Sequence, residues 1–146
     1  MEIDTTRFGR ISIGSEQILC FPEGLPGLED FQQWVVIADR KVKHMAWLQS
    51  VTEPAVALPV IRPRDLSPKQ RVRVHRGDVA SLGIRDPSDC WVAFVVNKDT
   101  AGLRANLRAP IIVNRQLRLG RQVIAKDDAM LHDFVSIAPQ ARRRAA

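Results

Sequence analysis

The chain has 146 residues, a formal net charge of +6 and a 45% share of hydrophobic residues. A domain of this length buries enough surface to fold without a disulfide or a metal, and no apolar run approaches the roughly 20 residues of a membrane-spanning helix. We therefore expect one soluble, cytoplasmic domain over residues 1–138. A basic, disordered tail over 139–146, which contains Arg142–Arg144, would follow it.

Charge and cysteine usage narrow the class of protein further. Residues 1–60 carry a formal charge of −3, whereas residues 61–146 carry +9. The basic half is compatible with nucleic-acid binding, but many of its arginines alternate with apolar residues, as on the solvated face of a strand. Tyrosine is absent, so no platform for stacking bases is visible. Cys20 and Cys90 each lie inside an apolar run, which predicts two buried, reduced thiols.

Short apolar or alternating runs recur along the chain, separated by turn residues. They predict strands over Arg7–Ile13, Gln17–Phe21, Trp34–Ala38, Met45–Val51, Ala55–Ile61, Arg71–His75, Cys90–Val96, Arg108–Asn114 and Gln122–Ala125. The turn Gly14–Glu16 would join the first two strands in a hairpin. Trp34–Ala38 is apolar throughout and is expected to be buried on both faces. Pro59 has no backbone N–H, which predicts an edge position or a bulge.

The connections are short and hold little helix. A helical turn is expected over Leu28–Gln33, and a short helix over Val79–Leu82, capped by Asp78 and ended by Gly83. Surface loops or turns are predicted over Arg62–Pro68, Asp86–Asp89 and Asn97–Leu103. The pattern predicts an all-β, single-domain fold. We expect an antiparallel β pseudo-barrel or sandwich of short strands with one or two short helical turns.

The stretch Phe21–Phe31 is rich in residues that shape the backbone, with two prolines and two glycines in close succession. Gly24 and Gly27 can adopt a positive φ, and Leu25-Pro26-Gly27 predicts a type II turn. The same stretch carries outward carboxylates on Glu23, Glu29 and Asp30. Loop physics alone predicts a stiff crossover between strands and no reaction.

Patterns typical of catalysis or metal binding are absent from the sequence. His44, His75 and His132 lie far apart, and none has a His or Cys at metal-ligand spacing. The chain contains no P-loop, GxSxG, GxGxxG or HExxH motif. We therefore expect no enzyme activity, no metal and no cofactor, and we interpret the chain as a binding protein.

Three stretches, in this order and at this separation, carry a family resemblance. They are Phe21–Glu29, then Trp47–Pro54, and then Ala105–Asn114 followed by Leu119–Val123. Together they resemble the flagellar assembly factor FliW family, over roughly residues 1–125 of this chain. Ile3-Asp4-Thr5 and Phe8-Gly9, ahead of the first predicted strand, fit the family as well.

The resemblance implies a compact β pseudo-barrel and a non-enzymatic cytoplasmic regulator that is a monomer when free. FliW proteins bind flagellin before export. When flagellin is depleted they bind CsrA, an mRNA-binding repressor, without occupying its RNA site, and so relieve the block on flagellin translation. The resemblance thus implies two mutually exclusive protein partners, with no membrane and no direct nucleic acid in the main role.

Site residues follow from the resemblance combined with the charge distribution. The acidic first sixty residues offer a surface for a basic partner, so we expect Glu23, Glu29, Asp30 and Glu53 to face CsrA. The motifs also mark residues with an expected structural role: Gly24, Pro26, Gly27, Gln49, Ser50, Asn106, Pro110, Asn114, Gly120 and Gln122.

Two other readings of the sequence remain open. One is an RNA-binding β-barrel regulator that uses the basic C-terminal half, and the other is a small β-barrel enzyme. For the flagellin partner a hydrophobic groove would be expected. Trp34, Trp47 and Trp91 all lie in predicted strands and are assigned to the core instead.

Overall fold

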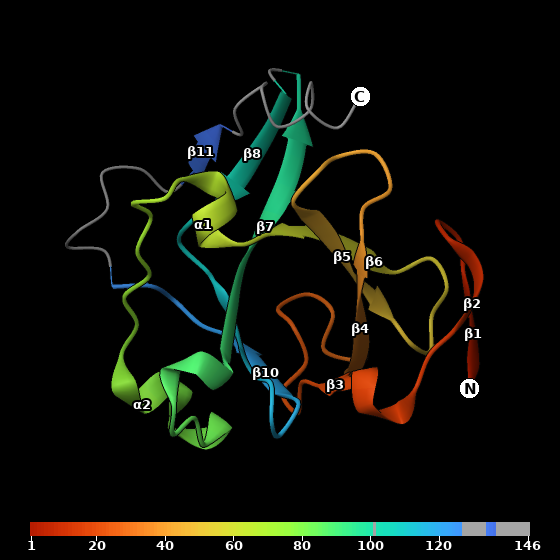
Figure 1. The fold of residues 1–146 in the computed structure, drawn as a ribbon, viewed down its shortest axis with the longest axis horizontal. Helices are drawn as coiled ribbons and strands as arrows, with labels where there is room; N and C mark the ends of the chain where they lie inside the picture. Colours follow the sequence, from red (N-terminus) through yellow and green to blue (C-terminus); the bar gives the residue numbers. More distant parts are fainter. Residues whose placement is uncertain (101, 127–133, 137–146) are drawn as a thin grey trace.

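The computed structural model describes residues 1–100, 102–126 and 134–136 (Figure 1). Its strands are β1 (Glu2–Thr5), β2 (Gly9–Ser12), β3 (Leu19–Cys20), β4 (Gln33–Ala38), β5 (Met45–Ser50), β6 (Ala57–Ile61), β7 (Cys90–Asp99), β8 (Gly102–Asn106), β9 (Ile111–Asn114), β10 (Leu119–Gln122) and β11 (Phe134–Ser136). Its helices are single turns: η1 (Ser15–Gln17), α1 (Pro63–Leu66), α2 (Arg76–Val79), η2 (Ala80–Leu82) and η3 (Pro87–Asp89). The all-β prediction is confirmed.

Pairing between β7 and β9 closes the main sheet into a ring in the order β7-β6-β5-β4-β3-β10-β9. The pairs in this ring are antiparallel except for a single parallel pair, Leu119 with Cys20, that joins β10 to β3. The last part of β7 leaves the ring and pairs with β8, which in turn pairs with β11 (Figure 1). Closure of this kind removes exposed sheet edges. The predicted pseudo-barrel is therefore present.

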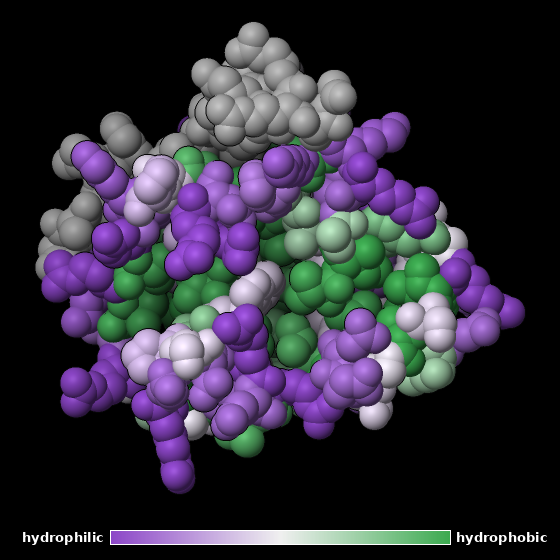
Figure 2. Space-filling model, viewed as in Figure 1, coloured by the Kyte–Doolittle hydropathy of each residue, from purple (hydrophilic) through white to green (hydrophobic). Residues whose placement is uncertain are grey.

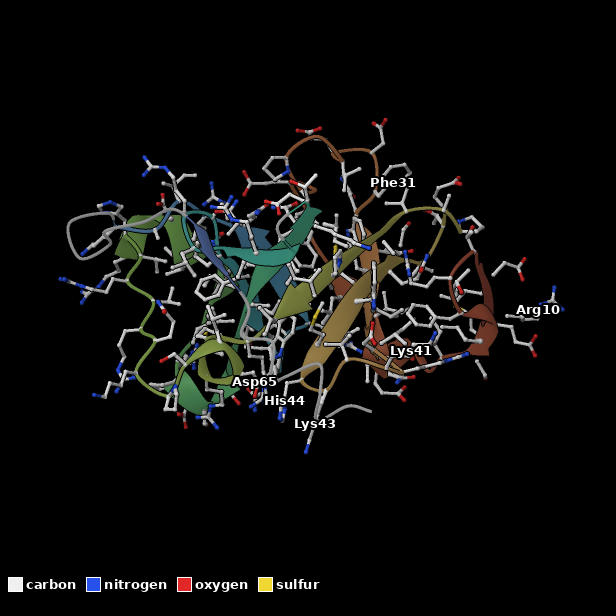
Figure 3. All side chains as sticks on the ribbon, turned by 90° about the horizontal axis from the view of Figure 1, so that it is seen from above. Arg10, Phe31, Lys41, Lys43, His44 and Asp65 are labelled. Carbon is white, nitrogen blue, oxygen red and sulfur yellow. The ribbon has the colours of Figure 1, made fainter. Side chains whose placement is uncertain are left out.

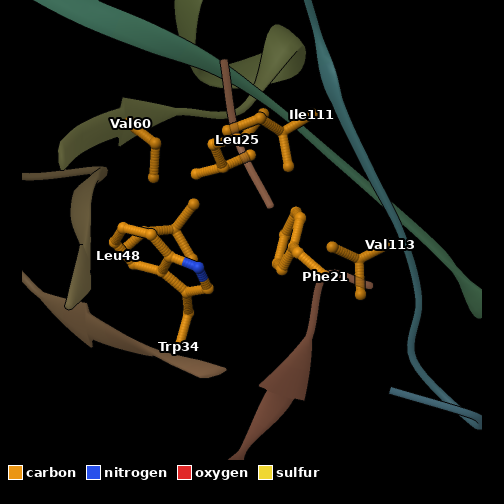
Figure 4. Close-up of a cluster of buried hydrophobic side chains, with 8 residues drawn as sticks. Phe21, Leu25, Trp34, Leu48, Val60, Ile111 and Val113 are labelled. Carbon is orange, nitrogen blue, oxygen red and sulfur yellow. The ribbon is translucent and has the colours of Figure 1, made fainter. Parts of the chain in front are cut away.

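The barrel is filled by the inward side chains of its strands, together with two residues of the Phe21–Phe31 stretch (Figure 4). The buried cluster consists of Phe21, Leu25, Trp34, Leu48, Val60, Ala93, Ile111 and Val113. Trp34 is fully buried, as predicted, whereas Trp47 and Trp91 are only half-buried. Cys20 and Cys90 are free thiols and are also half-buried, so their complete burial was a wrong prediction.

The N-terminal hairpin differs from the predicted one. β2 pairs with β1, not with the strand that follows it, and the predicted turn at Gly14 instead leads into η1. β3 is a strand of the ring and pairs with β4. The reason is apolar burial: Ile3 and Ile13 pack on Val35 and Val51, which fixes the hairpin as a separate ribbon on the barrel. Figure 1 shows this ribbon at the right edge of the molecule.

Two predictions for the central strands need correction. Trp34 and Val35 are buried, but Val36 and Ala38 are exposed, so β4 is not covered on both faces. Pro59 is not on an outer edge strand, because β6 lies between β5 and β7 in the sheet. The missing N–H is tolerated because β7 pairs only with Val60 and Ile61 of β6, which leaves the β7-facing side of Pro59 outside the ladder.

The segment between β6 and β7 holds more helix and less strand than predicted. α1 forms inside the predicted loop Arg62–Pro68, with Pro63 at its first position. The predicted strand Arg71–His75 makes only one bridge, Val74 with Ala125. Asp78 lies within α2 and caps no helix, whereas Gly83 ends η2 with φ 64°, as predicted. The alternation of Val72 and Val74 was misleading, because these side chains pack on the apolar cluster of Leu82, Ile112 and Val123 although their segment does not form a strand of the sheet.

The C-terminal half contains two further corrections. The strand predicted over Gln122–Ala125 is shifted: β10 ends at Gln122, and Ala125 makes only a bridge with Val74. Asn97–Leu103 is not a polar loop: β7 continues to Asp99 and turns into β8, with Asn97 opposite Arg104. Polar side chains are expected on these paired strands where both faces are wet. The tail predicted over 139–146 lies outside the described residues.

Candidate protein-interaction site

The turn chemistry predicted for the Pro-Gly stretch is present. Gly24 and Gly27 have φ values of 67° and 83°, and the Leu28 N–H donates to the Leu25 carbonyl at 2.7 Å, as a type II turn requires. The helical turn predicted over Leu28–Gln33 is absent. Only one reverse-turn bond follows, from Phe31 N to Leu28 O, before β4 begins.

Buried side chains and close glycine contacts hold this loop in place. Phe21 and Leu25 are within the core. Gly24 lies against the backbone of Glu29, where a Cβ on residue 24 would be 2.6 Å from the Glu29 Cα. Gly120 of β10 lies under the Phe21 ring, which a Cβ would also enter. The loop is therefore stiff, because both of its ends are packed.

Strand register brings two acidic loops to one end of the sheet. β4 and β5 are antiparallel, with Trp34 opposite Ser50, and the Val51 N–H donates to the Gln33 carbonyl at 3.0 Å. The loop that precedes β4 and the loop that follows β5 therefore leave the same end of this strand pair. We call the four predicted carboxylates carried by these loops the acidic end: Glu23, Glu29, Asp30 and Glu53.

The four carboxylates have different surroundings. Glu23 forms an ion pair with Arg121 of β10, with Oε2 2.9 Å from Nε. Glu29 accepts a hydrogen bond from the Gly27 N–H at 3.0 Å, and this bond holds the pKa of its carboxyl below the ordinary value. The Asp30 and Glu53 side chains are exposed and have no hydrogen bond or ion pair among the described residues. They are the most available to a partner.

Gln49 and Ser50 shape the second acidic loop from within. The Gln49 Nε2 lies 3.1–3.4 Å from the carbonyl oxygens of Ser50, Glu53, Pro54 and Val56. The Ser50 Oγ accepts from the Glu53 N–H at 3.1 Å. Both side chains are fully buried. The Glu53, Pro54 and Val56 carbonyls also accept backbone N–H groups, so the glutamine adds a second donor to carbonyls that are already bonded and ties the loop to β5.

The other residues marked by the motifs hold turns near β9 and β10. Asn114 is buried: its Nδ2 donates to the Leu82 carbonyl at 2.8 Å, and its Oδ1 accepts from the Gln116 and Leu117 N–H groups. The Gln122 Nε2 donates to the Ala109 carbonyl at 2.9 Å. Their roles are structural. Three marked positions remain. The Asn106 Oδ1 accepts from the Arg108 N–H, the Pro110 carbonyl accepts from the Val123 N–H, and Pro26 is exposed.

Metal and membrane features were also sought among the described residues. The His44 Nδ1 lies 3.5 Å from Asp65 Oδ1, and Asp65 also pairs with Arg62 at 2.7 Å. No group of three or more His, Cys, Asp or Glu side chains in residues 1–100, 102–126 and 134–136 could hold a metal ion. Within the same ranges, no helix has the length and apolar character needed to cross a membrane. His132 lies outside the described residues.

Sequence reasoning missed two features, one at the acidic end and one at the opposite end of the β4–β5 pair. Arg121 falls within a quoted motif, but its pairing with Glu23 joins segments far apart in the chain. Asp39 accepts from the Lys41 and Val42 N–H groups at 2.7 Å and from the Trp47 Nε1 at 2.8 Å. An aspartate that opens a polar turn is a local signal for the first two bonds. The bond to Trp47 could not be anticipated.

Comparison with known proteins bears directly on this arrangement. The model of the family described as FliW protein matches residues 2–134. The chain is 34% identical over 130 residues to the flagellar assembly factor FliW of Bdellovibrio bacteriovorus, covering 88% of this chain and 74% of that protein. It is 32% identical over 134 residues to the same factor of Thermoanaerobacter pseudethanolicus, covering 90% and 89%.

A solved structure agrees with the fold described above. The crystal structure of the flagellar assembly factor FliW superposes with a TM-score of 0.84 at 27% identity, over 95% of this chain and 98% of that one. The family match spans both acidic loops and the β9–β10 turns that support them. The chain belongs to the FliW family.

Proposed function

We propose that this chain acts as a partner-switching regulator of flagellin synthesis. In this proposal it binds flagellin, and when flagellin is depleted it binds CsrA away from the RNA surface of CsrA, which relieves repression of flagellin translation. It works in the cytoplasm as a monomer, without catalysis. The family match and the names of the relatives, each a flagellar assembly factor, support the flagellar part of this function.

The observation that carries the CsrA part is the acidic end. Stiff loops from two segments present carboxylates at one end of the β4–β5 pair, and two of these carboxylates have no partner among the described residues. A basic protein would be attracted to such a surface, with the charge acting mainly on association rate and selectivity. The rigidity of the loops limits the entropy lost on binding.

The direct test reverses charge at the acidic end. Glu29→Lys combined with Asp30→Lys should weaken CsrA binding by about tenfold or more in titration calorimetry, because like charges at an interface cost free energy. Glu16→Lys is the matched control: Glu16 is equally exposed but lies on η1, outside the acidic end. Equal affinity for all three proteins would remove these carboxylates from the interface.

The ion pair at Glu23 sharpens this test. Arg121 neutralises the Glu23 carboxylate in the free protein, so Arg121→Gln should release that charge and strengthen CsrA binding. Glu23→Gln removes a charge that is already paired and should weaken binding less than Asp30→Lys does. Exposed ion pairs contribute only about 0–1 kcal/mol, so the unfolding free energy of Glu23→Gln should stay near that of the parent. Arg121→Gln should cost about 1 kcal/mol more, because the Arg121 Nη1 also donates to the Asp78 carbonyl at 2.7 Å.

The two partners can be tested together by competition. Flagellin added to a preformed CsrA complex should displace CsrA in size-exclusion chromatography if both share one site or are coupled. A stable complex of all three proteins would contradict mutual exclusion, while leaving each binary interaction in place.

A further inference from the structure

A groove runs between β7 and the segment that connects β6 to α2. It has a volume of about 890 Å³, and Cys90, Trp91 and Val92 form its floor. Pro63, Pro68 and Pro87 contribute apolar walls. Figure 2 shows green residues gathered in a band across the middle of this face, with purple residues above and below the band.

An aliphatic pocket of about 350 Å³ continues the groove. The two share Pro87, Cys90 and Val92, and the pocket adds Val72, Ile84 and other branched side chains. Arg85 is the only charged residue that lines it within the part of the chain that the structure describes. A side chain seated there would gain from apolar burial, at about 25 cal/mol per Å² of surface removed from water.

The rim of the groove has charge of one sign. Among the described residues, Arg62, Arg64, Arg71 and Arg115 line it and no Asp or Glu does. Arg62 is held by Asp65 at 2.7 Å and Arg115 donates to the Ser88 carbonyl at 2.7 Å. Arg64 is exposed and has no hydrogen bond or ion pair among the described residues. The rim is therefore set to receive carboxylates.

From this geometry we propose that the groove binds an amphipathic segment of a partner protein. The segment carries aliphatic side chains on one face, which enter the floor and the aliphatic pocket, and carboxylates beside them, which meet the arginine rim. Helix-in-groove recognition uses this combination of anchors and flanking charge. RNA fits less well: a base could stack on Trp91 in the groove, but the adjoining pocket is lined by aliphatic side chains and has no aromatic one among the described residues.

A second copy of this chain also fits less well. Its carboxylates at the acidic end are accompanied by the exposed residues Pro22, Pro26 and Gly27, while Phe21 and Leu25 are buried in its own core. Aliphatic side chains at the acidic end are short or partly buried, as with the exposed Ala55 and the half-buried Leu28, and would fill the floor poorly. This inference does not rest on the proposed function, since it concerns a different face of the molecule.

The test uses the whole chain and three labelled helical peptides of about 18 residues, a length that supports a helix. One peptide pairs a leucine stripe with glutamates, a second pairs the same stripe with lysines, and a third replaces leucine with serine and keeps the glutamates. Fluorescence anisotropy at about 50 mM salt should show binding of the leucine–glutamate peptide only. Tight binding of the lysine or the serine peptide would overturn the proposal.

Protein variants then locate the binding. Arg64→Glu and Arg71→Glu should each lower the affinity for the leucine–glutamate peptide by about tenfold. Lys41 is exposed and lies outside the groove lining, so Lys41→Glu should leave this affinity unchanged. Equal affinity for all variants would overturn the proposal. Binding of oligouridine that is lost in Arg64→Glu, without peptide binding, would assign the groove to RNA. Self-association that Arg64→Glu abolishes, without peptide binding, would assign it to a second copy.

Discussion

At the scale of single residues, two glycines of the same loop have different constraints. Both have positive φ, which costs a residue with a Cβ roughly 1–2 kcal/mol. Gly24 also lies against the Glu29 backbone, whereas nothing lies within 4 Å of the Cβ position of Gly27. Backbone conformation and steric contact can therefore be separated within one turn.

Alanine at each glycine tests this separation. Gly27→Ala should lower the unfolding free energy by roughly 1–2 kcal/mol, and Gly24→Ala by roughly 2–4 kcal/mol, because displacement of the Glu29 backbone adds a packing cost. Urea denaturation with equal m-values measures both. Gly24→Ala should also disturb the position of Glu29 and so reduce CsrA binding. An equal decrease in unfolding free energy for the two variants would show that the loop backbone can move to accommodate the added methyl group.

At the scale of elements, Asp39 joins the turn after β4 to β5 and to the N-terminal ribbon. Burial raises the pKa of this carboxyl, but hydrogen bonds from the Val42 N–H, the Trp47 Nε1 and the Lys41 N–H outweigh burial, with a further contribution from the Arg7 charge, so that the pKa is lowered. The Arg7 guanidinium stacks 3.8 Å from the Trp47 ring centroid. One ionised carboxylate thus orders a turn and holds a cation–π pair above it.

A lowered pKa in the folded state means that the ionised form stabilises the fold above the unfolded pKa of about 3.9. This stabilisation is lost as the pH falls through the folded pKa. Asp39→Asn should therefore cost about 1–2 kcal/mol at neutral pH and progressively less toward pH 3, measured by denaturation at several pH values. Trp47→Phe removes one donor and should reduce the same pH dependence in part. If the unfolding free energies of Asp39→Asn and of the wild type changed in parallel with pH, Asp39 would be excluded as the source of this pH dependence.

The elements also show how far sequence reasoning reaches. The Leu25-Pro26-Gly27 turn and the strand Met45–Ser50 were predictable, because turn residues and apolar runs are local signals. The pairing of β2 with β1 was not, because it depends on which apolar faces meet in the fold. At the site, the four carboxylates could be named, but the ion pair of Glu23 with Arg121 joins segments far apart in the chain.

At the scale of the whole molecule, the two candidate surfaces lie on opposite sides. Figure 3 shows Phe31, which follows Asp30 of the acidic end, on one side of the barrel, and Asp65 and His44 on the other. Arg62, which pairs with Asp65, lines the groove. One face thus presents carboxylates and the other arginines. Such an arrangement orients incoming partners by charge, and the effect weakens as salt rises.

This separation predicts simultaneous binding at the two faces. A protein saturated with the leucine–glutamate peptide should bind CsrA with less than about a twofold change in affinity in titration calorimetry, because separate sites without a shared conformational change have little coupling. Arg64→Glu, which lowers the affinity for the peptide, serves as the control. Loss of CsrA binding on peptide addition would show that the sites overlap or are coupled. If coupling is absent, flagellin and CsrA can exclude each other only where both use the acidic end.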